Sequence, residues 1–194
     1  MTSAEVALEL VDKTEANLKR IEAFGEDFIT PSLNEWRYTI RHIIRASLSE
    51  NSEAEWQRAI GHLKRAYFDS YDILLDCQLK VLKEVNKRYR GYANQVTSII
   101  PEYPKYIQKI RAAQELHSRT GVEGFDRESY YNSLATTVNE LQEIIWTIST
   151  NADEIESVVR RAKIIYRSSV IAAGATIIGF LFHLGEKLSS WLFS

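Results

Sequence analysis

The stretch YYNSLATTVNELQEIIWTISTNADEIESVVRRAKII, residues 130–165, decides the fold class of this chain. Its apolar side chains recur every three or four positions, which is the spacing of one face of an α-helix. That face comprises Tyr130, Leu134, Val138, Leu141, Ile145, Ile148, Ala152, Ile155, Val159, Ala162 and Ile165. No glycine or proline interrupts it, so the pattern predicts a helix longer than globular proteins usually contain, with a kink expected at Thr150–Asn151.

Long helices are also expected upstream of this stretch. The expected segments are residues 3–24, 32–48, 52–100 and 105–118. Gly25 is expected to end the first of them, and Pro101 and Pro104 to end the third, because a proline lacks the amide donor that a helix interior requires. At 1.5 Å per residue the third helix would be about 70 Å long.

Capping boxes, in which a serine is followed three residues later by a glutamate, mark two helix starts. They are Ser32 with Glu35, directly after Pro31, and Ser52 with Glu55. The helix after the first box is expected to turn one apolar face inward, namely Leu33, Trp36, Ile40, Ile43 and Ile44. The loop RTGVEGFD, residues 119–126, is expected to end in a cap at Asp126.

These patterns predict an all-α protein, an elongated bundle of very long helices with a C-terminal transmembrane helix. We expect residues 1–125 to form a cytoplasmic bundle, residues 126–167 a long helix or stalk that packs on the bundle, and residues 168–192 the membrane helix. We expect no internal repeat with a period of about 20–50 residues.

The composition fits a folded protein rather than a disordered one. The chain has 194 residues, of which 45% are hydrophobic and 26% charged, and its net charge is -2. This charge gives no general attraction to nucleic acid, so nucleic acid is not an expected partner. The single cysteine, Cys77, excludes an intrachain disulfide and is typical of a reducing compartment.

Residues 168–185, SSVIAAGATIIGFLFHLG, contain no Asp, Glu, Lys or Arg. As a helix they would span about 27 Å, close to the hydrocarbon thickness of a bilayer. A basic cluster precedes them, consisting of Arg160, Arg161, Lys163 and Arg167. By the positive-inside tendency we expect a single-pass tail anchor in the inner cell membrane with the preceding residues in the cytoplasm. The alternative is a helix buried within a soluble oligomer.

Small and polar residues share one face of this tail. They are Ser168, Ala172, Thr176, Gly179 and His183. Small faces let membrane helices approach closely, so we expect several copies to associate through this face. An ionisable histidine at membrane depth favours a water-lined pore, although His183 could equally lie at the far interface.

A polar constellation lies upstream, where Arg37 and His42 have the spacing R-x4-H and His62 and Asp69 follow on the next helix. If a turn near residues 48–51 folds these helices antiparallel, the four side chains meet in a half-buried cluster. Such a cluster is either a structural ion-pair network between helices or a catalytic centre.

On Arg37 and His42 the chain resembles the HEPN-like helical bundles, whose motif is an arginine followed four to six residues later by a histidine. The resemblance covers about residues 30–120 and implies an oligomeric bundle, often one of prokaryotic antiviral defence. In active members it implies RNA cleavage, with His42 as general acid or base and Arg37 stabilising the phosphorane. The chain departs from the pattern at Tyr38, where the family usually has a polar residue, and in carrying the motif in an early helix.

Other catalytic signatures are missing. The chain contains no P-loop, GxSxG, HExxH, CxxC or dinucleotide fingerprint, and we expect neither a cofactor nor a metal site. The sequence thus predicts a tail-anchored homo-oligomer that perturbs the membrane, as a pore-forming or depolarising effector in prokaryotic defence. The first alternative is a membrane-anchored ribonuclease that uses Arg37, His42, His62 and Asp69. The second is a non-enzymatic adaptor that brings a partner protein, encoded by a neighbouring gene, to the membrane.

Overall fold

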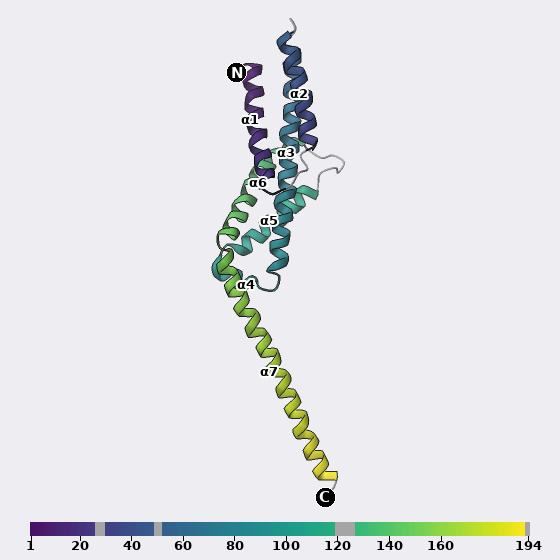
Figure 1. The fold of residues 1–194 in the computed structure, drawn as a ribbon, viewed down its shortest axis with the longest axis vertical. Coiled ribbons are helices and arrows are strands. Elements are labelled where there is room, and N and C mark those ends of the chain that lie inside the picture. Colours follow the sequence, from purple (N-terminus) through teal and green to yellow (C-terminus); the bar gives the residue numbers. More distant parts are fainter. Residues whose placement is uncertain (26–29, 49–51, 119–126, 193–194) are drawn as a thin grey trace. The chain divides into compact units, whose positions relative to one another are not determined.

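A computed structural model describes residues 1–25, 30–48, 52–118 and 127–192, and these residues form helices joined by short connections (Figure 1). The side chains at positions 30, 127, 128, 132, 174, 179 and 181–192 are not described. The helices are α1 (Ser3–Glu22), α2 (Thr30–Leu48), α3 (Ser52–Arg88), α4 (Ala93–Ile99), α5 (Tyr103–Ser118), α6 (Arg127–Thr150) and α7 (Ala152–Leu192). The described residues contain no strand, which confirms the all-α class.

The chain divides into two compact units. Unit 1 comprises Met1–Arg88 and Lys105–Thr147, and unit 2 comprises Tyr89–Pro104 and Ile148–Ser194. Unit 1 therefore contains α1, α2, α3 and most of α5 and α6, whereas unit 2 contains α4 and α7.

Helix α1 begins at a capping box that the sequence analysis missed. The Thr2 hydroxyl accepts a hydrogen bond from the Glu5 amide at 3.3 Å, and the Glu5 carboxylate accepts one from the Thr2 amide at 2.6 Å. This exchange satisfies two amides that the first helical turn leaves unpaired. Past the other end, Gly25 has a φ of 71°, so the expected stop at this glycine is confirmed.

The capping box expected at Ser32 and Glu35 is wrong. Helix α2 already begins at Thr30, and the buried Ser32 hydroxyl donates to the carbonyl of Ala66 on α3 at 3.3 Å. Pro31 therefore lies in the first turn of α2, where its missing amide costs nothing. The second expected box coincides with the first residue of α3, while residues 49–51 and 119–126, including the proposed cap Asp126, lie outside the described part.

The expected inward face of α2 is wrong in large part. Leu33, Ile40 and Ile44 are 46%, 51% and 53% exposed, and Trp36 and Ile43 are only half-buried. The fully buried side chains of α2 are Ser32, Thr39 and Ala46. Helix α2 is thus rotated from the expected orientation, because polar and small residues form its contact with α3.

Helix α3 is the centre of unit 1. Its leucines Leu63, Leu74 and Leu82 are fully buried, and α6 contributes a buried stripe of Leu134, Val138, Leu141 and Ile144. The buried Gln78 of α3 donates to the carbonyl of Val138 at 3.0 Å, which fixes the register of the two helices. The Nε2 of this buried amide is thus hydrogen-bonded, whereas its Oε1 has no hydrogen-bond partner among the described residues.

The expectation of one helix over residues 52–100 is wrong. Helix α3 ends at Arg88, Gly91 has a φ of 86°, and α4 begins at Ala93. The apolar stripe continues across this turn because Val96 and Ile100 remain buried. In unit 2, α4 packs on the first part of α7, where Ile155 and Val159 are buried.

Helix α7 is partly buried in its first turns and exposed farther along. The break before it, at Asn151, confirms the expected position of the kink. Beyond Ala162 every described side chain as far as Phe180 is exposed. Within the part of the chain that the structure describes, no helix combines the length and the apolarity that crossing a bilayer requires.

Candidate functional site

The sequence-predicted cluster between α2 and α3 contains two histidines in contact. The rings of His42 and His62 are stacked, with centroids 5.3 Å apart and planes 12° from parallel. The Tyr38 ring lies 5.3 Å from that of His62 on a tilted plane. The prediction that α2 and α3 bring His42 and His62 together is therefore confirmed.

Each imidazole is bound to a carboxylate of the opposite helix. Nδ1 of His42 lies 2.6 Å from Oε2 of Glu55, and Nδ1 of His62 lies 2.7 Å from Oε2 of Glu35. An ionised carboxylate can only accept a hydrogen bond, so we assign the Nδ1 proton to each histidine. The four side chains, with 14–20% of each exposed, form what we call the His–Glu network: Glu35, His42, Glu55 and His62.

Two arginines extend the network toward solvent. Arg58 pairs with Oε1 of Glu55 at 2.5 Å, and Arg65 lies 3.8 Å from Oε2 of Glu35. The hydrogen bond from His42, followed by the charges of Arg58 and other cations, lowers the pKa of Glu55. This carboxylate is therefore held in its charged form.

Arg37 and Asp69 take other places. The Arg37 side chain is exposed and donates to Asn34 at 3.2 Å, so the structure does not bring it to His42. Asp69 is half-buried, and burial, followed by repulsion from Glu35 and Asp72, raises its pKa. Of the four predicted residues, the structure joins His42 and His62 in direct contact, places Asp69 within electrostatic range of Glu35, and leaves Arg37 on the surface.

The sequence analysis missed Glu35 and Glu55 as network members, although a signal for them exists. Residues 32–46 and 52–66, SLNEWRYTIRHIIRA and SEAEWQRAIGHLKRA, share the pattern S-x2-E-W-x3-I-x-H-x2-R-A. Seven of the 15 aligned positions are identical: the Ser, Glu, Trp, Ile, His, Arg and Ala of the pattern. The expectation of no internal repeat is therefore wrong, because these segments repeat at an offset of 20 residues.

The structure uses the two copies of this repeat in equivalent ways. The glutamate of each copy binds the histidine of the other copy. A rotation by half a turn, about an axis between the stacked rings, therefore maps the pair Glu35–His62 onto the pair Glu55–His42. The corresponding alanines, Ala46 and Ala66, are both buried. Helices α2 and α3 are thus an antiparallel hairpin with approximate two-fold symmetry.

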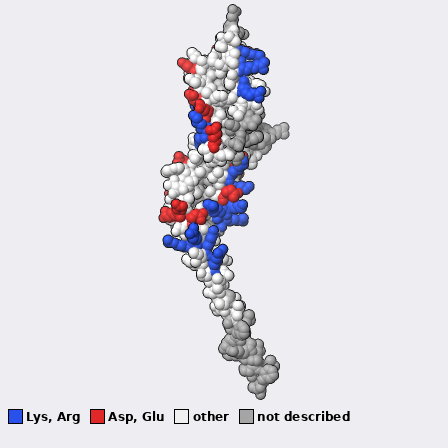
Figure 2. Space-filling view, viewed as in Figure 1, with Lys and Arg blue, Asp and Glu red and all other residues white. Residues whose placement is uncertain are grey.

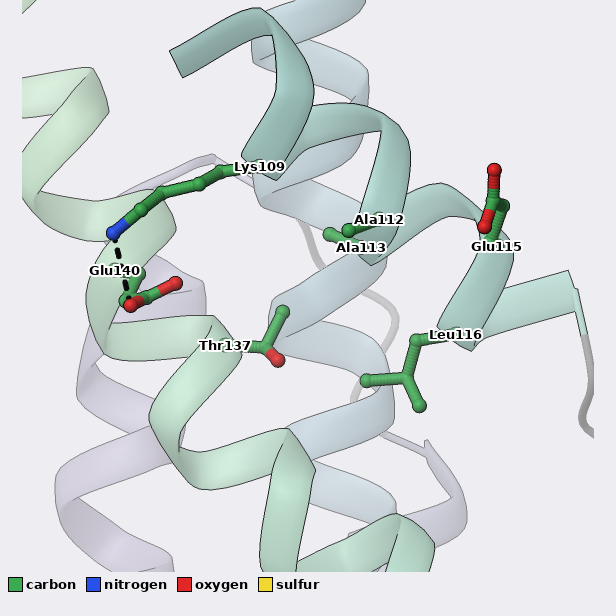
Figure 3. A pocket seen from close by; sticks show the side chains of 7 residues that line it. All are labelled: Lys109, Ala112, Ala113, Glu115, Leu116, Thr137 and Glu140. Atoms are coloured by element: carbon green, nitrogen blue, oxygen red, sulfur yellow. Dashed lines mark hydrogen bonds and ion pairs between the residues drawn. The ribbon is translucent and has the colours of Figure 1, made fainter. Parts of the chain in front are cut away.

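A hollow of about 320 Å³ lies elsewhere in unit 1, between α5 and α6 (Figure 3). Lys109 of α5 reaches across it to Glu140 of α6 at 2.9 Å, and small side chains, Ala112, Ala113 and Thr137, line much of the rest. Among the described residues that line the hollow, Glu115 is the one charged side chain outside this exposed ion pair. These described residues form no converging set of groups for chemistry.

The predicted small face of α7 is exposed where it is described. Ser168, Ala172 and Thr176 face solvent, and the two hydroxyls donate to the carbonyls of Ile164 and Ala172 one turn earlier, at 3.0 and 2.9 Å. These hydroxyls are therefore satisfied within their own helix. The side chains at Gly179 and His183 lie outside the described part.

The predicted basic cluster lies on α7 just before its apolar part. Arg160, Arg161, Lys163 and Arg167 are all exposed, and basic side chains mark this level of the helix in Figure 2. Nζ of Lys163 lies 5.3 Å from the centre of the Tyr92 ring, which is a cation–π distance. Below this level the described surface of α7 carries no charge (Figure 2).

Among the described residues, no group of three or more His, Cys, Asp or Glu side chains is placed to hold a metal ion. Compared with known proteins, the chain matches no family model, no curated protein and no solved structure. The resemblance to HEPN-like bundles therefore stays a prediction.

Proposed function

We propose that this chain attaches to a lipid bilayer through the C-terminal part of α7, self-associates there and makes the bilayer permeable. The observation that carries the proposal is the exposure of α7 from Lys163 to Phe180. Over these residues the helix is apolar on several faces at once. Its large exposed side chains are Ile164, Ile165, Tyr166, Val170, Ile171, Ile177, Ile178 and Phe180, each 53–72% exposed.

Exposure of such an apolar helix to water is unfavourable. Burying one isoleucine or phenylalanine side chain stabilises by about 1.5–3 kcal/mol, so eight of them supply a strong drive toward any apolar environment. A surface helix of a soluble domain keeps one polar face, whereas a helix that is apolar all round is buried in protein or lipid. The absence of charge over residues 168–185 favours lipid.

The basic cluster gives the attachment a direction. Four exposed cations, at Arg160, Arg161, Lys163 and Arg167, would meet anionic headgroups on one side of the bilayer. The positive-inside tendency assigns that side to the cytoplasm, so we propose that residues 1–167 face the cytoplasm at the inner cell membrane.

Self-association through the small face would bring several tails together. Ser168, Ala172 and Thr176 present no bulky side chain, and their internally bonded hydroxyls allow close approach of a second helix. A ring of such helices would enclose an opening through which the bilayer becomes permeable. The role in defence remains an implication of the HEPN resemblance.

The proposal is tested by dye release from vesicles that contain anionic lipid. The full chain is expected to float with the vesicles and to release dye, whereas a chain that ends at Arg167 is expected to do neither. This truncation removes no described side chain that is buried, so unit 1 and the α4/α7 contact should fold. Equal dye release from both chains would remove the mechanism.

A membrane-anchored ribonuclease is the second candidate, and the stacked pair His42–His62 with its two carboxylates is the observation that favours it. A carboxylate on Nδ1 orients an imidazole for proton transfer at its other nitrogen. The test is cleavage of single-stranded RNA by the full chain and by the variants His42→Ala and Arg37→Ala. Intact RNA in the presence of the unmodified chain counts against this candidate.

A further inference from the structure

The two-fold symmetry of the α2/α3 hairpin allows its two outer faces to be compared position by position. On α3 the outer face is covered by α1: Ile60 and Leu63 are 7% and 0% exposed and pack with Ala7. The partly buried side chains around this contact are Val6, Leu10 and Val11 of α1 and Trp56 of α3. One half of the hairpin thus shows what kind of element this face accepts, namely an amphipathic helix with small and aliphatic residues.

The same face recurs on α2 without a cover. The repeat places Trp36, Ile40 and Ile43 where α3 has Trp56, Ile60 and Leu63. Ile40 is 51% exposed, whereas its counterpart Ile60 is 7% exposed. The neighbouring Leu33 and Ile44 are 46% and 53% exposed. We call this surface the outer face of α2: Leu33, Trp36, Ile40, Ile43 and Ile44.

The outer face of α2 and the corresponding face of α3 differ in the charge of the residues that border them. The exposed arginines Arg37, Arg41 and Arg45 border the outer face of α2, and the equivalent positions of α3 are Gln57, Gly61 and Arg65. Glu35 is the sole acidic residue of α2, and it points into the hairpin toward His62. At the level of α2 in Figure 2, the charged side chains on the α2 side are basic, whereas both acidic and basic ones occur on the α1 side.

These charges select among the helices that could cover the face. A second copy that used its own α2 would bring three arginines against three arginines, which is unfavourable. The α1 of a second copy is already engaged on its own α3. A helix that carries aspartate and glutamate beside an aliphatic stripe would both bury the apolar residues and pair the arginines.

From these observations we propose that the outer face of α2 docks an amphipathic, acidic helix of another protein. The α1 helix is the template for such a partner, because its sequence SAEVALELVDKTEANLKRIE has five acidic and three basic residues and its aliphatic side chains already pack on the symmetry-related face. The proposal goes beyond membrane attachment, since the docking face belongs to unit 1 and the attachment segment to unit 2.

The test uses the full chain in detergent and a fluorescent synthetic peptide of residues 1–24, with binding followed by fluorescence anisotropy. We expect saturable binding that Ile40→Glu weakens about tenfold or more, because a carboxylate then replaces the centre of the apolar contact. Ile44→Glu should act similarly. Arg37→Glu and added salt should weaken binding through the charges. Circular dichroism should show unchanged helicity, because all three residues are exposed.

The matched control is Trp146→Glu, which changes an apolar side chain of α6 that is 65% exposed and should leave binding unchanged. Three results would overturn the proposal. The first is no binding of the peptide. The second is equal binding to the Ile40→Glu variant, because the peptide would then have replaced α1 on α3. The third is a smaller mass of the Ile40→Glu chain by light scattering, which would make the face a contact between copies.

Discussion

The rings of His42 and His62 are stacked with their centroids 5.3 Å apart, and Nδ1 of each ring is hydrogen-bonded to a glutamate of the opposite helix. Because Nδ1 of each imidazole faces a carboxylate, Glu55 at 2.6 Å from His42 and Glu35 at 2.7 Å from His62, each ring is tied to the helix that carries the other ring. The four groups therefore behave as one electrostatic unit that joins α2 to α3, and their removal should be felt by both helices.

The carboxylate of Glu55 should make the stability of unit 1 depend on pH. Its pKa is lowered in the folded chain, mainly by the hydrogen bond from His42. A carboxyl with a lowered pKa contributes stability that is full above its unfolded-state pKa and is lost as the pH falls through its folded-state pKa. We expect Glu55→Gln to lower the thermal midpoint at pH 7 and to flatten the decline of that midpoint between about pH 5 and pH 3.

Thermal unfolding followed by circular dichroism across this pH range measures the effect. Glu143→Gln on the exposed surface of α6 is the matched control and should shift the midpoint little. The prediction would be contradicted if the thermal midpoint of the Glu55→Gln chain declined with falling pH as steeply as that of the unmodified chain.

The two histidines should not contribute independently. Either His42→Ala or His62→Ala removes the imidazole donor of one of the two glutamates, which is expected to lower the free energy of unfolding. In the double variant the stacked neighbour is absent as well, so the total should differ from the sum by about 0.5 kcal/mol or more. A double-mutant cycle from denaturant unfolding measures this difference. Strict additivity would show that the two ion pairs are separate.

The helical class was predictable because apolar side chains at steps of three and four can be seen in the sequence alone. The break at Asn151 and the end of α1 near Gly25 followed from local chemistry in the same way. The break at Gly91 was missed because the apolar stripe keeps its phase through the turn to the buried Val96. Periodicity records which residues are apolar, and it does not record where the backbone turns.

The orientation of α2 was not predictable from its own sequence. Periodicity assigned Leu33, Ile40 and Ile44 to the core, whereas the contact with α3 is made by ionic partners that lie on another helix. The repeat at an offset of 20 residues carries the signal for this orientation, because it aligns Glu35 with Glu55 and His42 with His62. The alignment of these two pairs predicts that the glutamate of each segment binds the histidine of the other.

Two glycines should respond to alanine in opposite directions. Gly61 lies inside α3, and a Cβ added there would meet no atom within 4 Å. Gly61→Ala should therefore stabilise by about 0.5–1 kcal/mol through helix propensity. Gly91 also has open space, but its φ of 86° is strained for an alanine, so Gly91→Ala should destabilise by about 1–2 kcal/mol.

Both changes are measured by denaturant unfolding of the full chain. Because neither Cβ would contact another atom, the difference between the two variants isolates the backbone conformation. Destabilisation by Gly61→Ala, or stabilisation by Gly91→Ala, would contradict these backbone assignments.

Charges placed on the exposed apolar part of α7 should prevent membrane attachment without unfolding the chain. Ile171 and Ile178 are 72% and 58% exposed, so glutamate at either position disturbs little packing within the chain. In a bilayer, an acidic side chain near the centre of a helix is unfavourable by about 2.5–3.5 kcal/mol. Ile171→Glu with Ile178→Glu should therefore reduce co-flotation with vesicles about tenfold or more.

The matched control is Ile44→Glu, which changes an isoleucine on the outer face of α2 that is 53% exposed. It should leave flotation unchanged while it weakens binding of the acidic helix, and the α7 variant should show the reverse. Because the two surfaces belong to different units, this crossed pattern separates membrane attachment from partner docking. Loss of flotation in both variants would mean that α2 also contacts the bilayer. Flotation of both variants would mean that protein, and not lipid, covers the exposed isoleucines of α7.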